Sequence, residues 1–112
     1  MNEQNIVKQF DVVLVCLDPT VGKEIQKTRP CVVLTPNEMN TFSYTIIIAP
    51  MTTKEHLDIP TRIATVFKEK ESWIALDQIR TIDKQRIVKK LGKINKNCVI
   101  KIKDVIKEMF ID

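Results

Sequence analysis

Two polar residues stand where apolar segments of the sequence begin and end. Arg29 immediately precedes the apolar run 30–34, and Thr52 and Thr53 follow the run 44–49. A guanidinium presents several N–H donors in a planar fork that fits phosphate oxygens. Because it does not readily lose its proton, its best role is to stabilise charge that builds in a transition state. A threonine hydroxyl can donate to a phosphate oxygen or orient a ribose hydroxyl.

Glu24 lies five positions before Arg29 and could accept a proton or hold the arginine. These three side chains suit attack by an RNA 2′-hydroxyl on its own phosphate, a reaction in which RNA supplies the nucleophile and no metal is required. Each residue also has an ordinary structural interpretation. Arg29 could be a surface ion-pair partner of Glu24, Thr52 a turn residue, and Glu24 a solvated side chain. The residues alone therefore indicate a candidate anion site and leave catalysis open.

Other chemistry-bearing residues are few. The single histidine, His56, is interpreted as a solvated loop residue, and it excludes any mechanism that needs two histidines from one chain. The three cysteines fit no metal motif, and Cys16 and Cys31 are expected to be buried within apolar runs. No metal or cofactor is expected. The net charge is +4, and no acidic residue interrupts the cations from Lys84 to Lys103. Such a run suits either polyanion binding or a solvated lysine-rich surface.

The length of 112 residues predicts one domain, residues 1–112, and 44% apolar residues are enough for a core. The sequence contains no run of 18 apolar residues, so no membrane span is expected. The first ten residues lack the pattern of a signal peptide, and a cytoplasmic protein is therefore expected. Apolar runs, alternation and turn residues predict strands at 10–17, 30–34, 44–49, 59–63, 72–76, 78–82 and 89–94, with short helical turns at 37–43 and 84–86.

The last part of the chain changes to a helical period. Val99, Ile102, Ile106 and Met109 fall on one stripe, which predicts an amphipathic helix of about 14 residues with Asn97 as a candidate N-cap. Many short strands and one terminal helix predict a mainly β fold, a small barrel or strongly bent sheet with a helix packed on it. If the strands at 30–34 and 44–49 are antiparallel neighbours, Arg29 and Thr52 meet at one end of the sheet.

Three blocks of sequence resemble the MazF/PemK-type toxin endoribonucleases, in that family's order and at its spacing. The first is DVVLVCLDPTVGKEIQKTRPCVVLTP, residues 11–36, which carries a Pro-x-x-Gly-x-Glu loop and then Arg-Pro. The second is APMTT, residues 49–53, and the third is DQIRTIDKQRI, residues 77–87. The usual glycine before Asp11 is replaced by Phe10, where a local backbone adjustment is expected. Thr28 stands where some relatives carry histidine.

The resemblance implies an SH3-like β-barrel of the CcdB/PemK type, a homodimer, and metal-independent, sequence-specific cleavage of single-stranded RNA. The products would carry 2′,3′-cyclic phosphate and 5′-hydroxyl ends, and a cognate antitoxin would inhibit the enzyme. By position, Arg29 and Thr52 would be catalytic, with Glu24 either orienting Arg29 or assisting proton transfer. The implied RNA-binding residues are Gly22, Lys27, Thr28, Thr53 and Gln78.

Two other functions remain open from the sequence. The first is a DNA gyrase poison built on the same barrel, since fold alone does not determine function. Such toxins bind through a C-terminal tail that contains tryptophan, whereas the only tryptophan here is Trp73. The second is a barrel that binds nucleic acid without cutting it.

Overall fold

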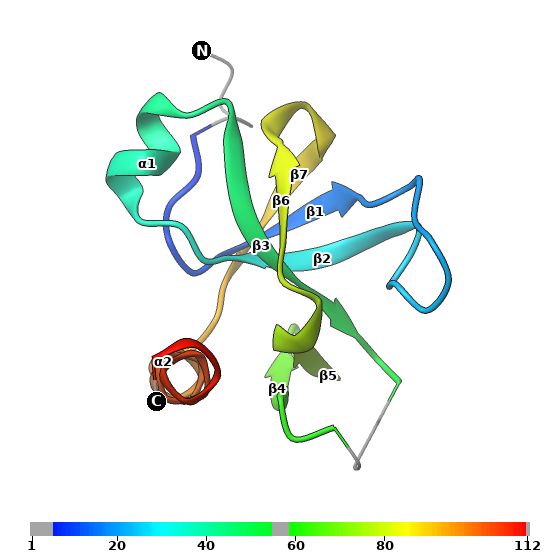
Figure 1. Cartoon of the computed structure of the whole chain (residues 1–112), viewed down its shortest axis with the longest axis vertical. Helices are drawn as coiled ribbons and strands as arrows, with labels where there is room; N and C mark the ends of the chain where they lie inside the picture. Colours follow the sequence, from blue (N-terminus) through cyan, green and yellow to red (C-terminus); the bar gives the residue numbers. More distant parts are fainter. Residues whose placement is uncertain (1–5, 55–58, 112) are drawn as a thin grey trace.

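The computed structural model describes residues 6–54 and 59–111 of the chain. Within them, a curled antiparallel sheet of seven strands is followed by a C-terminal helix (Figure 1), as the sequence predicted. The strands are β1 (Asp11–Cys16), β2 (Thr28–Val33), β3 (Thr45–Thr52), β4 (Arg62–Phe67), β5 (Lys70–Ala75), β6 (Arg80–Asp83) and β7 (Ile87–Lys93). The helical segments are α1 (Asn37–Phe42), η2 (Leu76–Gln78), η3 (Lys84–Arg86) and α2 (Lys96–Phe110).

The long strand β3 joins the two halves of the sheet. The strand order is β4-β5-β3-β2-β1-β7, and β6 pairs with β3 beside this path. The first half of β3 pairs with β6, its middle pairs with β2, and its end at Met51 and Thr52 pairs with β5. In Figure 1, β3 runs as one bent ribbon from α1 toward β4 and β5. A sheet that curls in this way hides most of its strand edges.

The central strands bury both of their faces. Val13, Cys31 and Ile48 belong to one apolar cluster, whereas their neighbours Val12, Val32 and Ala49 belong to another on the opposite side. Because successive side chains of a strand point to opposite faces, a strand covered on both sides must be apolar throughout. This explains why residues 12–17 read as an unbroken apolar run.

Helix α2 covers the second of these clusters. Cys98 and Ile102 are buried there among residues of β1, β2, β4 and β5. The N-cap is Asn95 and not the expected Asn97, because the Asn95 side chain accepts from the backbone N–H of Cys98 at 2.8 Å. Among residues 6–54 and 59–111, no helix is long and apolar enough to cross a membrane.

Most strand boundaries differ by a few residues from the sequence-based expectation, and three of these differences bear on the site. β2 begins at Thr28, so Arg29 lies within the strand and not before it. β3 continues through Pro50 to Thr52, because a proline can sit in a strand where the ladder does not need its nitrogen as a donor. The strand expected at 59–63 begins at Arg62, whose backbone N–H closes a turn onto the carbonyl of Ile59 at 3.1 Å.

Phe10 keeps the backbone conformation that a glycine would adopt. Its φ is +70°, in the left-handed region that glycine adopts readily. The Phe10 N–H donates to the carbonyl of Val33 at 2.7 Å, and its carbonyl accepts from Ile94 at 3.3 Å. The ring packs against the α2 side of the core, with the Lys103 ammonium 5.8 Å from its centroid. These contacts hold a conformation that is unfavourable for phenylalanine.

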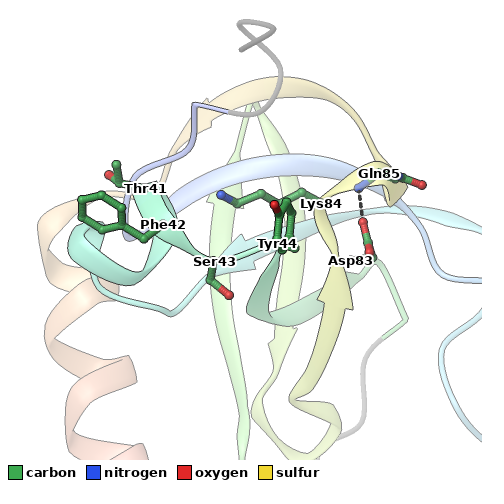
Figure 2. Close-up of a pocket in the computed structure, with 7 residues that line it drawn as sticks. All are labelled: Thr41, Phe42, Ser43, Tyr44, Asp83, Lys84 and Gln85. Atoms are coloured by element: carbon green, nitrogen blue, oxygen red, sulfur yellow. Dashed lines mark hydrogen bonds between the residues drawn. The ribbon is translucent and has the colours of Figure 1, made fainter.

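A buried polar network ties α1 to the sheet. The Thr35 hydroxyl donates to the Asn40 side-chain oxygen at 2.6 Å, and the Asn40 amide donates back to the Thr35 carbonyl at 2.8 Å. The Lys84 ammonium donates to the Asn40 carbonyl. Lys84 is buried, so it is not part of a solvated cationic run; Figure 2 shows its chain reaching from η3 toward α1. Satisfied networks of this kind fix one arrangement of elements.

An ion pair closes the end of the β4–β5 hairpin. Arg62 donates to both carboxylate oxygens of Asp77, at 2.8 and 3.1 Å, and Thr61 adds a hydroxyl donor at 3.4 Å. Burial raises the pKa of the Asp77 carboxyl, but the Arg62 hydrogen bonds and charge, with a backbone N–H and Thr61, outweigh burial and lower the pKa below its ordinary value.

We expect Asp77→Asn to lower the free energy of unfolding by about 1 kcal/mol at pH 7, the scale of a partly exposed ion pair. Because the folded-state pKa of Asp77 is lowered, its contribution is complete above the ordinary aspartate value, about 3.9, and is lost as the pH falls through the folded-state value. Urea unfolding of both proteins from pH 7 to pH 2 measures this. Asp104→Asn, on the exposed side of α2, is the control. A difference between wild type and Asp77→Asn that stays constant across this range would contradict the assignment.

Candidate active site

The register of β2 against β3, extended two residues beyond its last pair, brings Arg29 to the level of Thr52. Cys31 pairs with Pro50, Val32 with Ala49 and Val33 with Ile48. Each step toward the start of β2 is matched by one step toward the end of β3, because the strands are antiparallel. Two further steps bring Arg29 to the level of Thr52. The expected juxtaposition therefore comes from strand pairing, across 23 positions of sequence.

Both residues line one cavity of about 290 Å³. Its wall comes from β2, the end of β3, the β4–β5 hairpin and β7. The lining residues are Arg29, Pro30, Met51, Thr52, Thr53, Phe67, Lys68, Lys70, Ser72 and Leu91. Three cations and three hydroxyl groups share this cavity, and no carboxylate lines it among the described residues. The cavity is thus suited to an anion that carries apolar surface.

Arg29 is held by its backbone and by one side-chain hydrogen bond. It pairs with Val15 across β1, which fixes the main chain. Its Nε donates to the carbonyl of Gln26 at 3.3 Å. Within residues 6–54 and 59–111, Arg29 forms no ion pair, and so the expected surface pairing with Glu24 is not observed. Nε is one of five N–H donors, and the rest of the guanidinium fork can serve a ligand.

The Thr52 hydroxyl is oriented by the chain that follows it. Its Oγ1 accepts from the backbone N–H of Lys54 at 3.1 Å. An oxygen that already accepts one hydrogen bond still carries its own O–H donor. This hydroxyl is therefore fixed in position with a proton to donate. Thr52 also pairs with Trp73 of β5, so strand pairing holds the end of β3.

Glu24 and Gln78 lie together, away from this cavity. Both line a second cavity of about 190 Å³ with Pro50 and Arg80. Glu24 accepts from the backbone N–H of Val21 at 2.6 Å, which closes the loop 17–27 on itself. Gln78 accepts from Ile25 N–H at 2.6 Å and donates to the Lys23 carbonyl at 3.4 Å. These two side chains shape the β1–β2 loop; no described contact joins either of them to Arg29.

The other RNA-binding candidates lie around the same strand ends. Gly22 is at the exposed part of the β1–β2 loop with φ +59°, and Lys27 takes φ +70° directly before β2. The backbone N–H of Lys27 donates to Asp18 at 3.1 Å, and Thr28 begins β2 opposite Cys16. Thr53 lines the larger cavity with Thr52. His56 falls outside the described residues.

Cys31 belongs to β2 and lies two residues after Arg29. It is fully buried, and its thiol donates to the Arg29 carbonyl at 3.5 Å. Burial raises the pKa of this thiol to about 12, although the nearby Arg80 charge opposes the rise. Burial also raises the pKa of the Cys98 thiol. Cys16, in contrast, is exposed, which corrects the prediction that it is buried. Its neighbours Val15 and Leu17 are completely buried in one core cluster, and side chains alternate along a strand, so Cys16 points to the opposite, uncovered side.

Sequence reasoning missed Leu91 of β7 and every residue that the β4–β5 hairpin contributes to the cavity: Phe67, Lys68, Lys70 and Ser72. The β4–β5 hairpin was not expected to return to the Arg29 end of the sheet. The expected strands at 59–63 and 72–76 left residues 64–71 unassigned. The structure instead has β4 and β5 joined by a two-residue turn at Lys68 and Glu69. Among the described residues, no group of three or more His, Cys, Asp or Glu is placed to hold a metal ion.

The fold is that of toxins with solved structures. MazF from Deinococcus radiodurans (Form-I) superposes with a TM-score of 0.81 at 17% identity, covering 93% of this chain and 96% of that chain. A mycobacterial endoribonuclease in complex with its cognate antitoxin superposes with a TM-score of 0.74 at 18% identity, covering 93% and 92%. These similarities define the class of fold, a curled antiparallel sheet with a C-terminal helix.

Sequence comparison then identifies the family. The model of the PemK-like, MazF-like toxins of type II toxin–antitoxin systems matches residues 8–110. Endoribonuclease EndoA of Bacillus subtilis (strain 168) is 36% identical over 106 residues, covering 90% of this chain and 91% of that protein. Endoribonuclease MazF of Staphylococcus epidermidis is 33% identical over 102 residues, covering 87% and 85%. The chain belongs to the PemK-like, MazF-like toxin family, as its sequence blocks indicated.

We expect iodoacetamide at pH 8 to alkylate Cys16 in the folded protein while Cys31 and Cys98 stay unmodified. The thiolate is the reactive form, and burial keeps both inner thiols protonated. Peptide mass spectrometry after brief labelling measures this, and labelling in urea, where all three cysteines should react, is the control. Equal labelling of Cys31 and Cys16 in the folded protein would overturn the burial of Cys31.

Proposed function

We propose that this chain is a sequence-specific endoribonuclease toxin that cleaves single-stranded RNA without a metal. The observation that carries the proposal is the pairing of β2 with β3, which brings Arg29 and Thr52 to one cavity. Family membership and relatives named as endoribonucleases support RNA as the substrate. Residues 1–112 would act as one domain, since β3 is shared by both halves of the sheet.

In the proposed reaction, the RNA 2′-oxygen attacks the adjacent phosphorus and loses its proton. The bond from phosphorus to the 5′-oxygen breaks, and that oxygen gains a proton. The products are a 2′,3′-cyclic phosphate and a 5′-hydroxyl end. Arg29 stabilises the charge on the pentacovalent phosphate, because a preorganised cation acts most strongly where charge develops. Thr52 donates its hydroxyl to a phosphate oxygen and helps to set the 2′-hydroxyl.

The β1–β2 loop supplies the remaining proposed contacts to RNA. Gly22, Lys27 and Thr28 belong to this loop and to the start of β2, and Thr53 extends the Thr52 side of the cavity. We propose that Glu24 and Gln78 act by holding the loop in shape, since their side chains bond its backbone. Glu24 would therefore influence Arg29 through loop position and not by direct contact.

We further propose a cytoplasmic homodimer that a cognate antitoxin neutralises. A structural relative is a complex of an endoribonuclease with its cognate antitoxin, which supports an inhibitory partner. The RNA substrate supports the cytoplasm as the place of action. Phe42 and Tyr44 are each 86% exposed beside a cavity of about 480 Å³ (Figure 2), and such apolar surface supports self-association. This larger cavity contains neither Arg29 nor Thr52.

The gyrase-poison alternative is not favoured. The relatives found by sequence are named as endoribonucleases. Trp73 belongs to β5 and is only partly exposed. A barrel that binds nucleic acid without cutting it would not need a rigid arginine opposite an oriented hydroxyl.

We expect Arg29→Ala to lower the cleavage rate by roughly a hundredfold or more, the usual effect of removing one donor that stabilises developing charge. Thr52→Ala should also be impaired, whereas Thr52→Ser, which keeps the hydroxyl, should retain much more activity. Single-turnover cleavage of labelled RNA measures these rates. Thermal unfolding serves as the control that each variant still folds. Near-normal cleavage by folded Arg29→Ala would remove Arg29 from the mechanism.

We expect cleavage to be unaffected by EDTA and abolished by replacing the ribose before the cut with 2′-deoxyribose. The proposed nucleophile is the 2′-hydroxyl itself, so its loss stops the reaction while binding persists. Gel analysis of the products, with and without phosphatase, identifies the cyclic phosphate. Inhibition by EDTA, or cutting of the deoxy substrate, would indicate metal-activated water as the nucleophile instead.

A further inference from the structure

The cavity that holds Arg29 and Thr52 has a second cationic end. Lys68 and Lys70, from the turn and start of the β4–β5 hairpin, line it, and both are exposed. The two glutamates of the same hairpin, Glu69 and Glu71, do not line it. One cation is sufficient at the reacting phosphate, so the lysines provide positive charge that the proposed chemistry does not use.

The hairpin turn keeps lysine in a strained conformation. Phe67 pairs with Lys70, and the two residues between them, Lys68 and Glu69, have φ of +51° and +66°. Two-residue turns of this kind favour Asn-Gly, because other side chains are unfavourable at positive φ. Backbone strain at a non-glycine residue points to a role for its side chain. Lys27, a proposed RNA contact, has the same kind of strain at φ +70°.

Between the lysines and Arg29, the cavity wall is apolar with one buried hydroxyl. Pro30, Met51, Phe67 and Leu91 form the apolar part. The Phe67 ring packs close to Gly92, where an added Cβ would approach the ring to 3.4 Å, and the Lys68 ammonium lies 5.8 Å from the ring centroid. Ser72 is 8% exposed, and its hydroxyl has only a weak bond to the Lys70 carbonyl at 3.5 Å. This hydroxyl can donate to a ligand.

We infer that this end of the cavity binds one nucleotide of the RNA next to the cleaved phosphate, with its own phosphate on Lys68 and Lys70 and its base against Phe67 and Leu91. The inference rests on the proposed endoribonuclease function. Aromatic and apolar surface beside cations is how single-stranded nucleic acid is bound without strict sequence choice. The subsite therefore adds affinity and sets substrate length, while base preference is determined elsewhere.

The test compares Lys68→Asn/Lys70→Gln with the charge-matched control Lys96→Gln/Lys101→Gln on α2. Lys96 and Lys101 line none of the described cavities. Asparagine is chosen at position 68 because it tolerates positive φ. Binding is measured on RNA with 2′-deoxyribose before the cut, at several salt concentrations. Cleavage is measured at saturating enzyme on the ribose form of the same RNA.

We expect the hairpin variant to bind about tenfold more weakly. Its salt slope should fall by about 0.7, the value for one neutralised phosphate of single-stranded RNA, because both lysines contact the same phosphate. Its rate at saturation should stay within about twofold of wild type, because the reacting groups are untouched. The α2 variant should change neither quantity to that extent. The RNA is also shortened by one nucleotide at a time. Wild type should lose affinity at the step that removes the nucleotide bound by this subsite, and the hairpin variant should lose little affinity at the same step.

Each contrary outcome has a distinct meaning. If wild type cleaves RNA but the two variants bind alike, the subsite is wrong and the proposed function stands. If both variants bind RNA like wild type while only the hairpin variant loses affinity for a cognate antitoxin, the lysines serve a protein partner and the subsite is also wrong. If wild type cleaves no RNA, the proposed function fails first.

Discussion

The antiparallel pairing of β2 with β3 is the interaction on which the candidate site depends. Main-chain pairing fixes the relative position of two strands to within one residue, and a slip by one would turn every side chain to the other face. Val32 and Ala49 are completely buried as a pair, and their neighbours in each strand are buried on the opposite face. A slip by one would therefore exchange side chains between two close-packed clusters, which tolerate changes of volume and shape poorly. The register that packs the core is therefore also the register that brings Arg29 to Thr52.

Rigidity at the site comes from the same source. Arg29 is an internal residue of β2, paired with Val15, and Thr52 ends β3 opposite Trp73. A functional group on a strand is held more firmly than one on a loop, because packing on both faces limits the backbone. The flexible parts of the site, such as the long side chains of Lys27 and Lys68, lie at its rim. The arrangement places fixed groups at the reacting phosphate and adaptable cations around it.

Polar residues outside the cavity hold the loops that border it. Gln78 reaches across from η2 to the backbone of Ile25 and Lys23, and Glu24 closes the loop from within. Arg80 and Arg86 donate to carbonyls of Leu17 and of Cys16 and Asp18 at the start of the same loop. The DQIRTIDKQRI block thus supports the β1–β2 loop over most of its length. This gives a physical reason for the sequence blocks 11–36 and 77–87 to occur together in one chain.

The sequence by itself determined the elements whose pattern is local. Continuous apolar runs predicted the central strands, the 3.6-residue period predicted α2, and the polar loop that ends in Arg29-Pro30 marked the site together with Thr52. Only the tertiary structure decided what depends on distant contacts. Proline at position 50 read as a stop, yet β3 continues because partners on both sides hold it. Asn95 caps α2 in place of Asn97. Cys16 is exposed, since the burial of a strand residue depends on which elements pack over its face of the strand. Lys68 and Lys70 joined the cavity because the sheet curls, and no local pattern encodes where a curled sheet brings a hairpin turn.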